Sequence, residues 1–302
     1  MPRLSFNKCV KKRLISLIFV VCALGSSSLA GQKSSSGRIE NFHFTSRTFH
    51  NTRYIHVWLP PGYDDPANAS ARYPVLYMND GQTTFHNVRA EGRGGDWGAD
   101  ETAAKLIASG KIEPLIMVAI DNAGDDRDSE YMPVRDKYYR TDLTQVHGGL
   151  YPAMLFDEVV PFVNEHYRTR AGDIGLGGSS MGAAISLYTV VARPGKISRL
   201  LLESPSLYVG EGWLLDKAKA NHDWPSRIYV GIGTNEMPND VVGSREAVGD
   251  VDIFHKLLNS AGVPKDHLMI RVQPDASHNV QAWADRFGSA LKFLYGKDKN
   301  EH

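Results

Sequence analysis

The chain has 302 residues, of which 42% are hydrophobic, 23% charged and 10% aromatic. This composition is typical of a globular protein, and the length suffices for one large domain or two small ones. The formal net charge is zero, but removal of a basic N-terminal segment leaves 29 basic side chains against 34 acidic ones. An acidic balance argues against a nucleic-acid partner.

Residues 1–30 have the features of a secretory signal peptide. They carry five basic and no acidic side chains, then an apolar run from Leu14 to Leu24, then small residues that include Ser28 and Ala30. This run is short for a membrane span of about 20 residues. We therefore expect export to the periplasm or the medium, with no stable membrane span after cleavage. Lipoprotein processing at Cys22 is an alternative.

Both cysteines, Cys9 and Cys22, fall inside this segment, so the mature chain would contain no disulfide and no cysteine metal site. A leader rich in Ser and Gly follows at residues 31–37. No comparable linker occurs later in the sequence. This pattern predicts one catalytic domain over residues 38–296 and a polar tail at 297–302.

Short apolar runs alternate with helical patterns along this domain. The first run alternates like a half-buried strand, and the others are continuous, as in strands covered on both faces. The predicted strands are 53–60, 73–79, 114–121, 174–177, 198–204, 227–233 and 268–273, and the predicted helices are 101–109, 151–168, 181–192, 253–261 and 280–295. This order predicts an α/β fold with a mostly parallel, doubly wound sheet and helices on both faces.

The stretch GLGGSSMG, residues 175–182, joins a predicted strand to a predicted helix. A dinucleotide fingerprint would need glycine at Ser180, and a Walker loop would need Gly-Lys-Ser or Gly-Lys-Thr. The pattern that fits is Gly178-x-Ser180-x-Gly182, a nucleophile elbow, in which small residues let the strand and the helix approach closely. So short a pattern also arises by chance. The strand before it and the helix after it favour catalysis.

A nucleophilic serine needs a base and an acid that orients the base, and this elbow is followed along the chain by the acid and then the histidine. Of the histidines after Ser180, only His278 directly follows the last predicted strand. Glu236, three residues past Gly233, is the predicted acid. The competing carboxylates are Asp240, Asp250 and Asp252.

The oxyanion of the tetrahedral intermediate needs two backbone N–H donors. Met181, the residue after the nucleophile, is one predicted donor. The other should follow the strand 73–79, where Gly81 and Gln82 are the candidates and Gln82 is preferred. An ordinary Asp-Gly turn is the alternative at that position.

Motifs over residues 53–283 resemble those of a known family. They are VWLPPGYD, RYPVLYMNDGQTTF, PLIMVAIDN, DRDSEYMP, GLGGSSMGAAISLY, ESPSLY, GTNE and SHNVQAW. The chain is similar to the esterase group of α/β hydrolases that includes siderophore, feruloyl and acetyl xylan esterases. The resemblance implies the α/β-hydrolase fold, with nucleophile, acid and base at Ser180, Glu236 and His278. Aspartate is common at the acid position of that group.

The resemblance also points to residues beside the active-site cleft. Arg127, Glu130 and Tyr131 match a motif found there, and they could bind an acyl or sugar group or brace a loop by an ion pair. Independently of the resemblance, Trp97, in a glycine-rich loop at 91–101, could line the cleft or be a buried core residue.

We therefore expect an exported serine esterase with no cofactor and no metal, since no zinc-type histidine spacing occurs. Its expected substrate is a small-molecule or carbohydrate-linked ester, with an acetyl or feruloyl acyl group. The alternatives are hydrolysis of a siderophore lactone, acyl transfer on the same machinery, and a non-catalytic protein that binds such ligands.

Overall fold

The computed structural model describes residues 36–86 and 95–297, all of which belong to one compact unit, Lys33–His302. The predicted signal peptide at 1–30, most of the leader at 31–37, both cysteines and all but the first residue of the tail lie outside the described residues. Among the residues described, no helix is long and apolar enough to cross a membrane.

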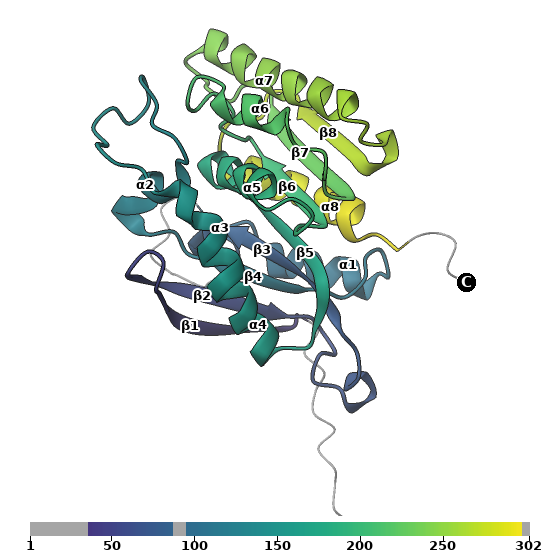
Figure 1. The fold of residues 1–302 in the computed structure, drawn as a ribbon. Coiled ribbons are helices and arrows are strands. Elements are labelled where there is room, and N and C mark those ends of the chain that lie inside the picture. The colour runs from purple at the N-terminus through teal and green to yellow at the C-terminus, as the bar shows by residue number, and fades with distance from the viewer. Residues whose placement is uncertain (1–35, 87–94, 298–302) are drawn as a thin grey trace, which may run out of the picture. The chain divides into compact units, whose positions relative to one another are not determined.

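The described residues form one eight-stranded sheet with the order β1-β2-β4-β3-β5-β6-β7-β8 (Figure 1). β2 runs antiparallel to its neighbours β1 and β4, and the strands from β4 to β8 are parallel. The strands are β1 Arg38–Ser46, β2 Asn51–Leu59, β3 Tyr73–Asn79, β4 Ile116–Ile120, β5 Thr169–Ser179, β6 Arg199–Glu203, β7 Arg227–Gly233 and β8 Leu268–Gln273.

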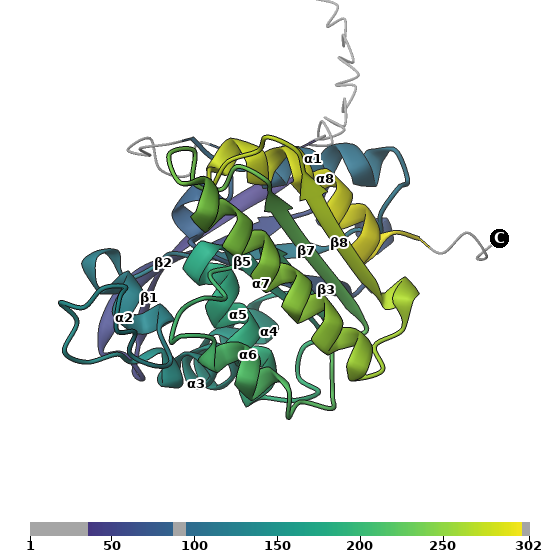
Figure 2. The same ribbon diagram turned by 90° about the horizontal axis from the view of Figure 1, so that it is seen from above.

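Helices cover both faces of the sheet (Figure 2). They are α1 Ala99–Ala108, α2 Arg127–Tyr131, α3 Tyr151–Ala153, α4 Val160–His166, α5 Ser180–Ala192, α6 Trp213–Ala218, α7 Val241–Ser260 and α8 Val280–Tyr295, with π-helical turns at Met154–Val159 between α3 and α4. One core lies under α1 and α8, and a larger one lies under α3 to α7. Successive residues of a strand point to opposite faces, so Leu201 of β6 enters the first core while Leu200 and Leu202 enter the second.

The α/β-hydrolase architecture predicted from the sequence is confirmed, and the differences lie at its margins. β1, α2 and α6 were not predicted. α7 begins at Val241, twelve residues before the predicted start, because Asp240 caps it by accepting a hydrogen bond from the N–H of Gly243. The prediction that β8 is covered on both faces is wrong, since it is the last strand of the sheet and Val272 is 41% exposed.

Parallel strands end at the same edge of a sheet, and that edge gathers the predicted active-site residues. Ser180 directly follows β5, and Glu236 lies three residues beyond β7. His278 lies in the loop between β8 and α8. The chain order serine, acid, histidine is therefore also the order of three strands across the sheet.

Candidate active site

Ser180 is the first residue of α5 and directly follows β5, with a left-handed backbone (φ 56°). A non-glycine residue pays for this conformation, of order 1–3 kcal/mol, and holds it only where the surroundings enforce it. A Cβ atom at Gly178 would lie 2.9 Å from the backbone carbon of Gly182, and one at Gly182 would lie 2.8 Å from the carboxylate of Asp80. The small residues of the elbow are thus required by close packing on both sides of the serine.

The last residue of β3 fastens the start of α5. The Asn79 side-chain amide donates to the carbonyl of Gly182 and to the hydroxyl of Ser186, each at 2.9 Å. Its own carbonyl accepts a hydrogen bond from the hydroxyl of Tyr151. Asn79 therefore links the central strand to the helix that begins at Ser180. The orientation of its side-chain amide is fixed because the donor and acceptor sides are both occupied.

His278 and Glu236 are joined directly. The Nδ1 atom of His278 lies 2.6 Å from Oε2 of Glu236, and the backbone N–H of His278 donates to the carbonyl of Glu236 at 3.2 Å. The Glu236 side chain is 2% exposed, whereas that of His278 is 36% exposed. This arrangement leaves Nε2 of the imidazole as the nitrogen that can act as a base.

The charge of Glu236 is held by its hydrogen bonds. Burial alone would raise the pKa of this carboxyl, but donation from His278, from the N–H of Gly233 and from the hydroxyl of Ser204 outweighs burial, so the pKa lies below its usual value. Oε1 accepts from Gly233 at 2.7 Å and from Ser204 at 2.8 Å. Glu236 is thus an ionised carboxylate at neutral pH.

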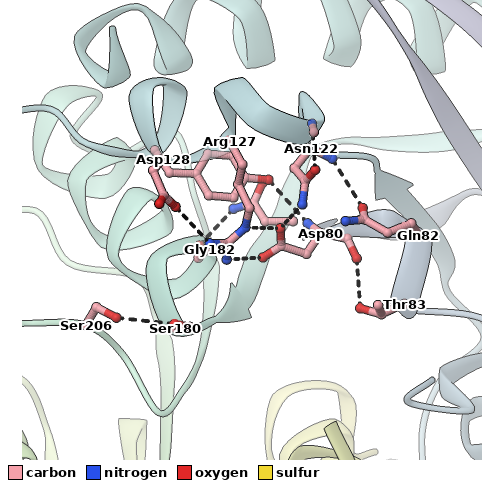
Figure 3. A network of polar contacts seen from close by, with 12 residues as sticks. Asp80, Gln82, Thr83, Asn122, Arg127, Asp128, Ser180, Gly182 and Ser206 are labelled. Atoms are coloured by element: carbon pink, nitrogen blue, oxygen red, sulfur yellow. Dashed lines mark hydrogen bonds and ion pairs between the residues drawn. The ribbon is translucent and has the colours of Figure 1, made fainter. Parts of the chain in front are cut away.

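Residues 204–206, just beyond β6, touch both parts of the site. Ser204 bonds to Glu236, while Ser206 donates its N–H to the carbonyl of Ser180 at 3.2 Å. The two hydroxyls of Ser180 and Ser206 lie 3.4 Å apart (Figure 3). No hydrogen bond joins Ser180 to His278 among the described residues, although apo sites often tighten this contact only when substrate binds.

The two predicted oxyanion donors lie on the elements that flank the serine. Met181 is in the first turn of α5, where backbone N–H groups have no partner within the helix. Gln82 lies in a single 3-10 turn, Gly81–Thr83, directly after β3. Its side-chain carbonyl accepts from the N–H of Asn122 at 3.3 Å, which holds the turn against the loop after β4.

Asp80 occupies the space between β3, α5 and α2 (Figure 3). Its carboxylate forms a two-pronged ion pair with Arg127, at 2.6 Å to Nε and 2.8 Å to Nη2, and accepts from Asn122 at 2.7 Å. The N–H of Asp80 donates to the hydroxyl of Tyr131 at 3.3 Å, and the Arg127 guanidinium lies over the ring of Tyr131. Arg127 and Tyr131 therefore brace the loop that carries Gln82.

A sequence model of one protein family, described as Putative esterase, matches residues 46–294. The chain belongs to this family. It is a carboxylic ester hydrolase of the α/β-hydrolase fold. The uncharacterized protein YbbA of Bacillus subtilis is 23% identical over 265 residues, which cover 83% of this chain and 95% of that protein.

Solved structures with similar folds include two esterases. The enterobactin esterase of Shigella flexneri aligns with a TM-score of 0.65 and 17% identity over 84% of this chain, and this chain spans 58% of that one. A ferulic acid esterase aligns with a TM-score of 0.63 and 18% identity, covering 86% of this chain and 98% of that one. At such identities the likeness shows the shared fold alone.

Two further residues from the sequence motifs lie inside the esterase. The Glu130 carboxylate forms an ion pair with Arg53 at 2.8 Å, and their side chains are 3% and 1% exposed. Trp97 is 4% exposed and packs against Trp283 and Phe287 in the core under α1 and α8. These surroundings favour the bracing alternative for Glu130 and the core alternative for Trp97.

The competing carboxylates have other places. Asp240 caps α7, and Asp250 and Asp252 lie midway along that helix. Burial, with the nearby charge of Glu246, raises the pKa of Asp250. Among the described residues, no group of three or more His, Cys, Asp or Glu side chains is arranged to hold a metal ion.

Sequence reasoning did not assign roles to Ser204, Ser206 or Tyr208, although all three lie in the motif ESPSLY. Tyr208 is 41% exposed, and its ring meets that of Tyr139 at 6.0 Å, edge to face. Burial raises the pKa of the Tyr208 phenol, and hydrogen bonding to Ser206 acts against it. An aromatic pair therefore lies next to the hydroxyl that contacts Ser180.

Proposed function

We propose that this esterase is exported and uses Ser180 as nucleophile, His278 as base and Glu236 as the acid that orients the base. The backbone of Ser180 carries the proposal, because a left-handed serine between a buried strand and a helix places its hydroxyl at the sheet edge. The bonded pair His278–Glu236 beyond the same edge supports it.

The chemistry follows from these positions. As the Ser180 Oγ–carbon bond forms, the hydroxyl proton moves to Nε2 of His278, and the carbonyl electron pair moves to the oxygen. The N–H groups of Met181 and Gln82 would stabilise that oxyanion. The carbonyl re-forms, the bond to the alcohol breaks, and the alcohol takes the proton from His278. Water then repeats the steps on the acyl-enzyme, releasing the acid and restoring Ser180.

Intact-mass spectrometry after treatment with a fluorophosphonate tests this assignment. We expect one adduct on the native protein and none on Ser180→Ala, because the probe reacts with an activated serine. Ser206→Ala, which changes the neighbouring hydroxyl, serves as the matched control and should still take the adduct. An adduct that persists in Ser180→Ala would overturn the assignment of the nucleophile.

For the substrate we propose acetyl or feruloyl esters of carbohydrate. The aromatic pair Tyr139 and Tyr208 suits an aromatic acyl group, and a ferulic acid esterase shares the fold. A siderophore lactone is the second candidate, because the enterobactin esterase also shares it. Initial rates on methyl ferulate, acetylated xylan and enterobactin, each against Ser180→Ala, separate them. Acyl transfer would show as a sugar ester formed in place of free acid.

Export has a separate test. The full chain is expressed in a bacterial host and the mature protein is weighed by mass spectrometry. Cleavage after Ala30 would remove both cysteines, so the mature protein should not react with a thiol reagent. A full-length mass in the cytoplasm would contradict export and leave the esterase assignment intact.

A further inference from the structure

A series of hydrogen bonds between buried side chains extends from the sheet to the proposed triad. Glu203, the last residue of β6, and Arg286 of α8 form an ion pair at 2.6 Å, and both side chains are 0% exposed. The Nη1 atom of the Arg286 guanidinium donates to the side-chain carbonyl of Gln273 at 3.0 Å. A side chain at Gly231 would overlap the Glu203 carboxylate, so this glycine makes room for the pair.

Ser204 is the next residue in this series. Its hydroxyl accepts from Trp283 Nε1 at 3.0 Å and, more weakly, from Arg286 Nη2 at 3.4 Å. A hydroxyl has two acceptor sites and one proton. Since both acceptor sites face donors, the proton is directed to Oε1 of Glu236, 2.8 Å away.

The hydrogen bond from Ser204 to Glu236 also affects His278. Oε1 of Glu236 receives two donors, Ser204 and the N–H of Gly233, so the carboxylate presents Oε2 to His278. Hydrogen bonds donated to a carboxylate favour its charged form, so these two donors favour an ionised Glu236, which accepts an N–H from Nδ1 of His278. That tautomer leaves Nε2 free as the base.

Besides donating to Ser204, Trp283 contacts His278 of the proposed triad. Its ring meets the His278 ring edge to face at 5.2 Å and an angle of 87°. Trp283 and Arg286 are three residues apart on α8 and therefore lie on one face of it. α8 thus carries both donors to Ser204 and a wall for the imidazole.

We propose that Ser204, held by Trp283 and Arg286, is a positioning residue that fixes the Glu236 carboxylate and the tautomer of His278. The inference rests on the proposed triad. It adds to the triad a hydroxyl that bonds to Glu236, Trp283 and Arg286.

The test is the rate at which a fluorophosphonate labels Ser180, measured from pH 5 to pH 9, roughly the range over which a histidine base titrates. In Ser204→Ala the rate at neutral pH should fall about tenfold to a hundredfold, the worth of a hydrogen bond to a charged group. The acid limb of the profile, where the rate falls at low pH, should move to higher pH. With one donor fewer, the Glu236 carboxylate is more basic. A proton on Glu236 or on the His278 imidazolium is then held more tightly.

Two further variants keep the test decisive. Ser204→Gly suits the left-handed backbone (φ 43°) and should fold even where alanine is strained, yet it should lose the same rate. Trp283→Phe keeps a ring beside His278 but removes one donor, and should cost about fivefold. Ser260→Ala, which removes an exposed hydroxyl bonded to the carbonyl of Lys256, is the control and should label at the native rate.

The outcomes separate the two proposals. If the native protein is not labelled at Ser180, the proposed function fails. If it is labelled and the Ser204 variants match its rate and pH profile, positioning by Ser204 is wrong and the triad stands. A lower melting temperature with an unmoved acid limb would likewise overturn it, since that result marks a purely structural role.

Discussion

Ser180 and Ser204 follow two residues that pair directly across neighbouring parallel strands, Ser179 of β5 and Glu203 of β6, and both serines have a positive φ. A left-handed backbone at a non-glycine residue costs of order 1–3 kcal/mol. Two adjacent strands therefore end in strained serines at one edge of the sheet. One hydroxyl contacts Ser206 and the other bonds to Glu236, so both strained serines lie where we propose that the reaction occurs.

The acid can be identified by a matched pair of carboxylate-to-amide variants. Glu236→Gln would present an NH₂ group to donors or to His278 Nδ1, which disfavours the productive tautomer, and we expect kcat/KM to fall on the order of 100- to 10,000-fold. Asp240→Asn should leave kcat/KM unchanged, because asparagine caps a helix as well as aspartate does. The measurement is hydrolysis of a p-nitrophenyl ester. A crippled Asp240→Asn with an active Glu236→Gln would show that the wrong carboxylate was chosen.

The elbow glycine makes a prediction about stability. An alanine at Gly178 would place its Cβ 2.9 Å from the backbone of Gly182 and 3.0 Å from Asn79, so α5 must shift. We expect Gly178→Ala to lower the free energy of unfolding by about 1–3 kcal/mol and to reduce activity with it. Urea denaturation measures the change.

Gly288→Ala is the control for that substitution. Gly288 lies inside α8, and the nearest atom to its added Cβ is Thr102 Cγ2 at 3.5 Å. Alanine there should raise stability by roughly 0.5–1 kcal/mol, because glycine is a poor helix former. Similar effects at the two positions would argue that the elbow is not packed as described.

The sequence sufficed for the elbow and most of the fold because those signals are local. Gly178, Ser180 and Gly182 lie within five residues, and the central strands are continuous apolar runs. β1 was missed because it is an edge strand with many polar, exposed positions. The role of Ser204 depends on Glu236 and Trp283, 32 and 79 residues away, so only packing reveals it.

A substitution in the buried pair Arg53–Glu130 tests whether Glu130 braces the structure or binds substrate. Glu130→Gln leaves an almost fully buried guanidinium without its counter-charge, and we expect a loss of about 3–5 kcal/mol in the free energy of unfolding. In the folded fraction, kcat/KM should stay near the native value. Glu101→Gln breaks the exposed pair with Lys105 and should cost less than about 0.5 kcal/mol. A large loss of kcat/KM at native stability would instead place Glu130 in contact with substrate.

Glu158 should make part of the stability depend on pH. Its carboxylate accepts from the hydroxyl and N–H of Thr48, at 2.6 and 2.8 Å, and from the N–H of Arg47 at 3.1 Å. Burial alone would raise its pKa, but these hydrogen bonds outweigh burial and lower it from 4.5. The contribution of ionised Glu158 to the free energy of unfolding is therefore complete above pH 4.5, and it is lost as the pH falls through the lowered pKa.

Glu158→Gln tests this by urea denaturation between pH 7 and pH 3, roughly the window in which carboxyl groups titrate. The variant should be about 1–2 kcal/mol less stable than the native protein at neutral pH, because the amide is a weaker acceptor than a carboxylate. That gap should close toward the acid end, where the native carboxyl gains its proton. Other carboxyls titrate equally in both proteins, so only the difference between the two curves is read. A gap that stays constant across the range would show that Glu158 contributes through packing and not through its charge.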